Sequence, residues 1–177
     1  LHIKTDNTHI GYGETIRVPM DMGTVYAGPA LGVVIGKKAC CVTEETALDY
    51  VQGYTIVNEV SLAETSFYRP AVKAKCRDTF CPIGPWVIDA CHITNPQSLA
   101  INTYINDSLS HETSTQELIY SIEKVIAYIS SFITVEVGDR ILAGTQLRTK
   151  NLAIQAGDKV TVEIDQIGRL VNPVAAE

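Results

Sequence analysis

Short β-type runs divide most of this chain, and they limit the possible fold more than any other feature. LGVVIGK (31–37) is an apolar run closed by Gly36, and GYTIVNEVSL (53–62) is rich in β-branched residues. LAINTYIND (99–107) alternates apolar with polar residues and ends in an Asn-Asp turn. Many short runs separated by turn residues predict a mainly β (α+β) domain, a mixed sandwich or roll with a few helices.

Two further runs near the end of the chain begin in the same way. GDRILAGT (138–145) and GDKVTVEIDQIGRLVNPV (157–174) each open with a Gly-Asp turn that leads into a strand. The likeness of VGDRI to AGDKV is too short to indicate a repeat, and two turns of the same chemistry explain it.

Two segments carry helix signals. Thr43 is placed to N-cap EETALDYV, with two glutamates in the first turn. Ser114 and Glu117 form the S-x-x-E pattern of a capping box, which predicts a second helix beginning there. Apolar residues then recur at helical spacing and predict one buried stripe that is core: Leu118, Ile119, Ile122, Val125, Ile126 and Ile129.

Composition fits a folded chain with a core, at 46% apolar and 19% charged residues over 177 positions. No Pro- or Ser-rich linker interrupts it, so we expect a single domain over residues 1–177. The net charge of −6 argues against a nucleic-acid partner. No run approaches the roughly 20 apolar residues that cross a bilayer, which argues against a membrane protein.

The beginning of the chain shows no apolar signal-peptide region, so we expect a cytoplasmic protein. A start at Leu1 with a strand pattern is what we expect if an N-terminal segment is missing, although an unusual start codon would give the same beginning.

Five cysteines stand at positions 40, 41, 76, 81 and 91. Cys76, Cys81, Cys91 and His92 have the spacing C-x4-C-x9-C-H, which is wider than the pairs typical of zinc sites. We therefore expect buried or half-buried free thiols, with a zinc site as the alternative. A nucleophilic cysteine would need a base, and His92 is the nearest candidate in the sequence.

Four separated segments together resemble the fumarylacetoacetate hydrolase superfamily. They are YVQGYTIVNEVSLAETSFYRP, KAKCRDTFCPIGPWV, GDRILAGTQ and GDKVTVEIDQIGRLVNPV. Within it, the likeness is to the isomerase/decarboxylases of 4-hydroxyphenylacetate (homoprotocatechuate) catabolism, and FYRPAVKAKCRDTFCPIG resembles the first half of their tandem members. The resemblance implies the β-sandwich or roll of the superfamily's C-terminal domain. It also implies an enzyme that isomerises or decarboxylates 2-keto or 2-hydroxydienoic dicarboxylic acids through a stabilised enolate.

Members of this superfamily hold Mg²⁺ or Mn²⁺ with three carboxylates, and the ion chelates the keto acid. Two carboxylates come from an E-x-E before a strand, and those positions are Gly28 and Ala30 here. The third falls at Glu59, while Glu64 and Ala63 occupy the last acid and the arginine of that segment. The resemblance therefore implies a degenerate site for Mg²⁺ or Mn²⁺ with Glu59 as its one remaining ligand, with a chain that binds no metal as the alternative.

Other positions keep the pattern of the superfamily. Lys75 matches the lysine of the superfamily, which holds a substrate carboxylate or polarises a carbonyl. Lys73 is the nearest alternative for this role. Gly144 and Thr145 match a substrate-binding G-T-P, with Gln146 in place of the proline. Tyr68 and Arg69 lie where side chains reach the substrate, although an ordinary surface ion pair is the alternative for Arg69.

The histidines at positions 2, 9 and 111 receive no role, since His9 and His111 lie in polar, loop-like contexts. Three hypotheses follow: an isomerase/decarboxylase, an inert half that pairs with a metal-competent paralogous subunit, and a metal-independent dicarboxylate sensor. The expected partners are a small keto-dicarboxylate and a second subunit, in a homodimer or a heterodimer.

Overall fold

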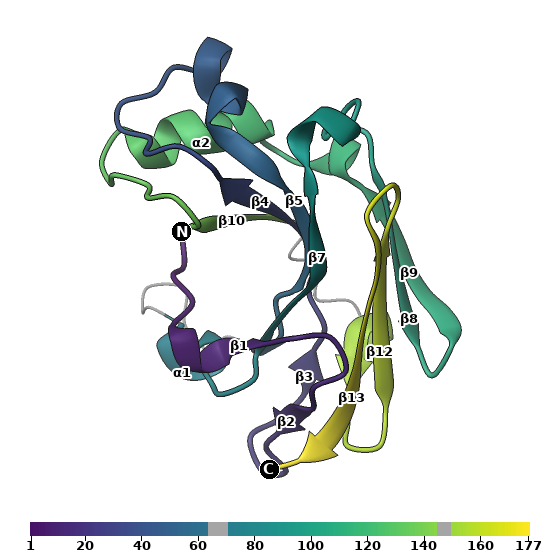
Figure 1. The fold of residues 1–177 in the computed structure, drawn as a ribbon. Helices are drawn as coiled ribbons and strands as arrows, with labels where there is room; N and C mark the ends of the chain where they lie inside the picture. Colours follow the sequence, from purple (N-terminus) through teal and green to yellow (C-terminus); the bar gives the residue numbers. More distant parts are fainter. Residues whose placement is uncertain (64–70, 145–149) are drawn as a thin grey trace.

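A computed structural model of the chain describes residues 1–63, 71–144 and 150–177. Strands dominate it, and they form two large sheets and one small sheet (Figure 1). The first large sheet has the strand order β1 (His9–Ile10), β7 (Cys81–Asp89), β5 (Val51–Asn58), β4 (Pro29–Ile35) and β10 (Arg140–Gly144). Its strands are antiparallel except for β1, which runs parallel to β7.

The second large sheet has the order β2 (Ile16–Val18), β13 (Gly168–Ala176), β12 (Lys159–Ile164), β8 (Ala100–Ile105) and β9 (Ser108–Ser114). Only β2 and β13 are parallel in it. The small sheet consists of β11 (Ala153–Ile154), β3 (Val25–Tyr26) and β6 (Ser61–Leu62).

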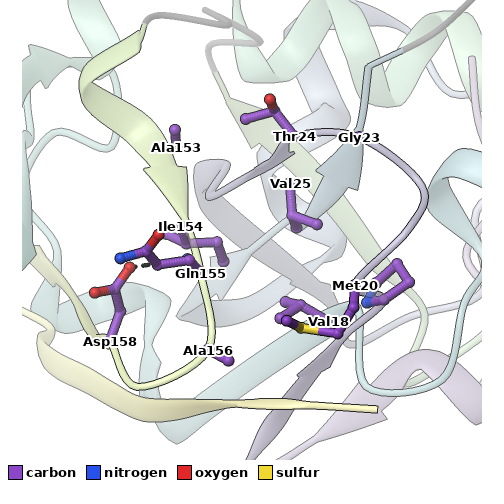
Figure 2. Close-up of a pocket in the computed structure, with 11 residues that line it drawn as sticks. Val18, Met20, Gly23, Thr24, Val25, Ala153, Ile154, Gln155, Ala156 and Asp158 are labelled. Atoms are coloured by element: carbon purple, nitrogen blue, oxygen red, sulfur yellow. Dashed lines mark hydrogen bonds between the residues drawn. The ribbon is translucent and has the colours of Figure 1, made fainter.

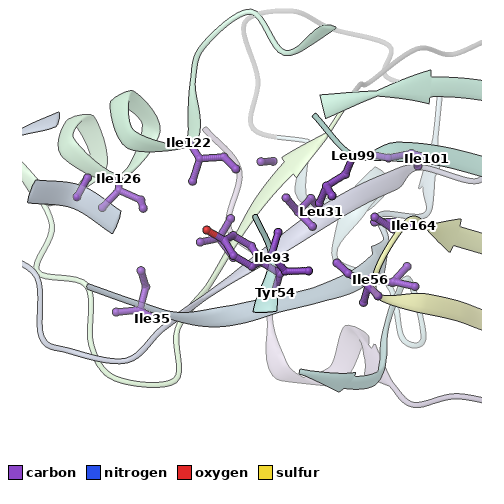
Figure 3. Packing of buried hydrophobic residues seen from close by; sticks show 14 of the residues in the cluster. Leu31, Ile35, Tyr54, Ile56, Ile93, Leu99, Ile101, Ile122, Ile126 and Ile164 are labelled. Carbon is purple, nitrogen blue, oxygen red and sulfur yellow. The ribbon is translucent and has the colours of Figure 1, made fainter. Parts of the chain in front are cut away.

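Side chains from both large sheets meet in one core. The apolar faces of β4 and β5 supply Leu31, Ile35 and Ile56, and the second sheet supplies Ile101 and Ile164 (Figure 3). All of these residues are at most 2% exposed. A second cluster joins β2, β3 and β12 around Phe80 and Leu152. The predicted mainly β sandwich or roll is therefore confirmed.

Helices are few and short. The two α-helices are α1 (Val72–Lys75) and α2 (Ile122–Ser130). Short 3₁₀ helices lie at η1 (Asp6–Thr8), η2 (Glu44–Tyr50), η3 (Ala90–His92), η4 (Thr115–Glu117) and η5 (Lys150–Leu152). Helix α2 packs on η2 and covers one end of the core with Ile122 and Ile126 (Figures 1 and 3).

Turn chemistry follows the sequence closely. Asn106 and Asp107 have φ angles of 52° and 65° and close the β8–β9 hairpin. In the two Gly-Asp turns the aspartate accepts a bond from the backbone three residues earlier, Asp139 from Glu136 and Asp158 from Gln155, both at 2.8 Å. The explanation of VGDRI and AGDKV as two turns of one kind is thus confirmed.

Two predicted strands differ from the structure. The run 53–62 is split into β5 and β6, because the backbone leaves the first sheet at Glu59. There the Glu59 N–H donates a hydrogen bond to the carbonyl of Gly28. The run 157–174 is a hairpin of β12 and β13, with Gln166 at φ 63° and Gly168 at φ 122° in its turn.

Both predicted helices differ as well. Residues 44–50 form a 3₁₀ helix, and the Thr43 side chain makes no capping bond. Helix α2 begins at Ile122 rather than near Ser114, and Ile119 is 89% exposed instead of core. No described helix is long and apolar enough to cross a bilayer.

Candidate active site around Glu59

The edge where β4 begins and β5 ends brings together the positions that the sequence singled out. Pro29 pairs with Asn58 in the antiparallel ladder, so the next residues outward, Gly28 and Glu59, lie side by side. The Glu59 N–H donates to the Gly28 carbonyl at 2.6 Å, and the Gly28 N–H donates to Asn58 Oδ1 at 2.8 Å. Ala30 lies on the same edge.

The Glu59 carboxylate is held by two ammonium groups. Lys75 Nζ, from α1, lies 3.2 Å from Oε1 and 3.0 Å from Oε2. Lys4 Nζ, from the N-terminal coil, lies 3.2 Å from Oε1. The side chains of Lys75, Lys4 and Glu59 are 2%, 7% and 14% exposed, so this cluster of three charges is largely withdrawn from water.

Lys4 also fixes the backbone around the cluster. Its ammonium group donates to the carbonyls of Val60 at 3.1 Å, Lys75 at 2.5 Å and Phe80 at 3.0 Å. With the Glu59 contact it has four oxygen partners, which is a positioning role. The sequence reasoning missed this residue, because a single lysine in LHIKTDN carries no spacing signal.

Gly144 lies opposite Ala30 in the β4–β10 ladder. A Cβ added at Gly144 would stand 2.5 Å from the Cβ of Ala30, closer than real Cβ contacts allow. The need for glycine at this position is therefore explained by close strand packing, next to the Glu59 cluster.

A separate pocket of about 660 Å³ lies between the β2–β3 connection and β11 (Figure 2). Its acidic side chain, Asp158, accepts bonds from the backbone of Gln155 and from Asn106 Nδ2, both at 2.8 Å. Both carboxylate oxygens of Asp158 are thus already occupied, and among the described residues none of the predicted site residues lines this pocket.

Comparison with known proteins decides the family. The family model "Fumarylacetoacetate (FAA) hydrolase C-terminal" matches residues 1–175. The chain belongs to this family. It is 43% identical over 176 residues to the 4-hydroxyphenylacetate degradation bifunctional isomerase/decarboxylase of Escherichia coli, covering 99% of the chain and 39% of that enzyme. The chain thus spans about two fifths of the length of such relatives.

Solved structures of the FAA hydrolase family share the fold. The 2-hydroxyhepta-2,4-diene-1,7-dioate isomerase from Mycobacterium marinum is 32% identical with a TM-score of 0.90, over 98% of this chain and 68% of that one. The maleylpyruvate hydrolase from Sphingobium, solved with manganese(II) and pyruvate, is 29% identical with a TM-score of 0.88, over 98% of this chain and 63% of that one. Divalent metal binding therefore occurs in the family.

The donors described here do not fit such an ion. Of the three family acid positions only Glu59 has a carboxylate, and both of its oxygens face ammonium groups. A Cβ at Gly28 would lie 2.2 Å from the Glu59 carbonyl oxygen, so the backbone fills the place of a longer side chain. In the described ranges no three His, Cys, Asp or Glu residues come together as a metal site.

The two lysine candidates from the sequence differ in their surroundings. Lys75 is buried in the cluster, whereas Lys73 is exposed on α1 rather than on the same face of a strand. The remaining candidates, Tyr68, Arg69 and Thr145, lie outside the described residues, as does Glu64.

Among the described residues, the cysteines take part in no group of three or more possible metal ligands. Burial raises the pKa of Cys81 to about 11, which keeps its thiol neutral. Cys76 is half-buried, as expected, but Cys91 and His92 are exposed on η3. Cys40 and Cys41 are exposed as well, and of the three thiols expected to be buried or half-buried only Cys91 departs from the prediction.

The histidines lie away from polar loops in two of three cases. His9 is in β1 and His111 in β9, so the loop assignment was wrong for both. Desolvation of the imidazole is the larger cause that lowers the pKa of His9, and the positive charge of Arg140 is the second. His2 lies in the N-terminal coil and is exposed.

Proposed function

We propose that the chain binds the keto-acid end of a 2-keto or 2-hydroxydienoic dicarboxylate beside Lys75, as one half of an isomerase/decarboxylase of 4-hydroxyphenylacetate catabolism. The observation that carries the proposal is the convergence of Gly28, Ala30, Glu59 and Lys75 at one edge of the first sheet. The 43% identity to the bifunctional enzyme of Escherichia coli supports the substrate class.

The chemistry asked of this site is stabilisation of an enolate. In decarboxylation the carbon–carbon bond to a carboxylate breaks and carbon dioxide leaves. The electron pair of that bond stays on the substrate and is delocalised onto the keto oxygen. In isomerisation a proton leaves one carbon and returns to another through the same enolate. Lys75 supplies a buried ammonium group that attracts the developing oxyanion. We propose substrate contacts for Gly144, Thr145, Tyr68 and Arg69, as expected from the sequence.

A second candidate function is an inert half that pairs with a metal-competent paralogous subunit. The misfit of the Glu59 cluster with a divalent ion favours it, because two ammonium groups compete for the carboxylate that remains. We propose that this chain itself holds neither Mg²⁺ nor Mn²⁺ at Glu59. The expected localisation in the cytoplasm stays a prediction.

The test follows the ultraviolet absorbance of 2-hydroxyhepta-2,4-diene-1,7-dioate with the purified chain, with and without Mg²⁺ and with a chelator. We expect turnover that the chelator does not remove, that Lys75→Met abolishes and that the exposed control Lys73→Met leaves unchanged. Lys75→Arg keeps the positive charge, and its comparison with Lys75→Met shows whether a loss of turnover reflects misfolding. No turnover, alone or with a metal-competent paralogue, would overturn the enzymatic proposal.

A thermal-shift measurement with the same dicarboxylate separates binding from turnover. Stabilisation without metal and without turnover identifies a sensor or an inert half, and only the inert half gains activity when the paralogous subunit is added. Absence of both a thermal shift and turnover contradicts the proposed binding site itself.

A further inference from the structure

Two adjacent cysteines project from the connection between β4 and η2. Cys40 and Cys41 are both exposed, and their sulfur atoms lie 3.9 Å apart. Cys41 has a φ angle of 52°, in the left-handed region that few non-glycine residues adopt. The Glu59 cluster uses neither cysteine.

The backbone on both sides of the pair is fixed. Ala39 exchanges two hydrogen bonds of 2.9 Å with Val135, one in each direction. The Cys41 N–H donates to the carbonyl of Ser130 at 2.9 Å, and the Val42 N–H donates to Ser130 Oγ at 3.0 Å. Ala39 and Val42 are buried. The two thiols are therefore presented together by an anchored segment.

The sulfur separation favours a bridging atom over a direct disulfide. Adjacent Cα atoms lie about 3.8 Å apart across a trans peptide, which is below the roughly 4.4–6.8 Å that disulfides span. A single atom that bonds both sulfurs at about 2.3 Å can span separations up to about 4.6 Å. The observed 3.9 Å lies within that reach, so one bridging atom can join the two thiols.

The number of donors selects the kind of bridging atom. Across the described ranges no third His, Cys, Asp or Glu joins the pair, and metal ions such as Zn²⁺ prefer four ligands. A trivalent arsenic that already carries one carbon substituent needs two sulfurs only. We propose that Cys40 and Cys41 form a two-thiol site for monosubstituted trivalent arsenicals and related soft, thiophilic electrophiles.

The binding step is balanced without oxidation or reduction. With phenylarsine oxide the arsenic–oxygen double bond is replaced by two arsenic–sulfur bonds, and the two thiol protons leave with the oxygen as one water molecule. The arsenic stays trivalent, and the sulfurs stay at the thiolate level.

This site is remote from the Glu59 cluster. Gly28 and Glu59 lie at the start of β4, whereas the cysteines follow its end, and the seven residues of the strand span roughly 20 Å at about 3.3 Å each. The inference is therefore independent of the proposed function.

The experiment treats the chain with phenylarsine oxide and measures its intact mass. We expect one adduct per chain that excess 2-mercaptoethanol does not remove and that dithiothreitol does remove, since a dithiol replaces both sulfurs at once. Cys40→Ser and Cys41→Ser each lose the adduct, and the matched control Cys91→Ser, also exposed, keeps it.

Peptide mapping of the unmodified chain gives a second measurement that no variant can confound. Prior treatment with phenylarsine oxide is expected to protect Cys40 and Cys41, but not Cys91, from alkylation by iodoacetamide. An adduct that persists in the double serine variant, or one that the monothiol strips, would overturn the proposal.

Discussion

Glu59 joins one carboxylate to the ammonium groups of Lys4 and Lys75 in a largely buried place. Glu59→Gln removes the negative charge and leaves two buried cations facing a neutral amide. Breaking a buried ion pair in this way costs about 3–5 kcal/mol. We expect a loss of this size in the free energy of unfolding measured with urea.

Glu163 provides the matched control for that measurement. It pairs with Arg169 at 3.0 Å, but the two side chains are 29% and 61% exposed. Water screens such a pair, so Glu163→Gln is expected to cost at most about 1 kcal/mol. Equal losses in the two variants would show that the Glu59 cluster is not effectively desolvated.

Gly28 is held without a side chain by the carbonyl of Glu59, which a Cβ would approach to 2.2 Å. We expect Gly28→Ala to lower the free energy of unfolding by about 2–3 kcal/mol, because the backbone must move apart. Gly11→Ala, where the nearest atom would be 3.4 Å away, is expected to change stability by less than about 1 kcal/mol. Thermal or urea unfolding compares the two variants.

The close contact between Gly28 and Glu59 also affects any attempt to restore the metal site by substitution. Gly28→Glu and Ala30→Glu would supply the family carboxylates, but the first collides with the backbone and the second places a charge at a position that is 4% exposed. We therefore expect these substitutions to unfold the edge of the sheet before they create a metal site.

Cys81 gives the stability a defined dependence on alkaline pH. Burial raises its pKa from 9.0 to about 11 in the folded chain, so the unfolded chain loses the thiol proton first. Stability is therefore unaffected by this group below about pH 9 and falls as pH rises toward 11, by about 2 kcal/mol. Urea unfolding at both ends of this window should show a smaller fall in Cys81→Ala than in the unmodified chain. Exposed Cys91→Ala should keep the full fall.

Among the elements, α2 shows how a correct local signal can be assigned to the wrong turn. Ser114 does cap, but it accepts from Gln116 and starts only a 3₁₀ turn. Glu117 accepts from the Thr113 hydroxyl at 3.0 Å and leaves the capping box incomplete. The helix proper begins after Ser121, whose hydroxyl accepts from the Lys124 N–H at 3.2 Å.

Ser121→Ala should therefore destabilise the chain by about 1 kcal/mol, the usual cost of losing an N-cap. Circular dichroism during urea unfolding measures the change. Ser121→Asp, which also caps, should restore the stability. If Ser121→Ala were silent, the Ser121 bond would not be what starts the helix.

Strands and turns were predictable where their chemistry is local. LGVVIGK is buried over the whole of β4, and the Asn106-Asp107 turn is where the sequence placed it. The break between β5 and β6 was not predictable, since β-branched residues continue through it. It results from the bond between Glu59 and Gly28, which are distant in sequence.

For the whole molecule, the positions that the resemblance singled out at 28, 30, 59 and 144 lie at one edge of the first sheet, and Lys75 reaches Glu59 from α1. What the sequence could not show is their electrostatic state. Lys4 precedes Glu59 by 55 positions in the sequence, yet it contacts the Glu59 carboxylate in the fold. Only the folded chain places this carboxylate between two lysines.

The chain matches 39% of the length of the bifunctional enzyme of Escherichia coli, and a second subunit is its expected partner. We predict that sedimentation velocity at micromolar concentration finds a dimer of the chain, or a heterodimer when the paralogous subunit is added. A monomer under both conditions would contradict the pairing.

The bonds from Lys4 also have a practical side for handling the protein. They tie the first residues of the chain to the carbonyls beside the charged cluster, so any tag or fusion joined at Leu1 would emerge only three residues from it. The other end of the chain offers no clear escape, because Glu177 pairs with Arg77, which follows Lys75 by two positions. Affinity handles and surface-immobilisation linkers at either terminus are therefore best joined through a protease site and removed before the surroundings of Glu59 are assayed.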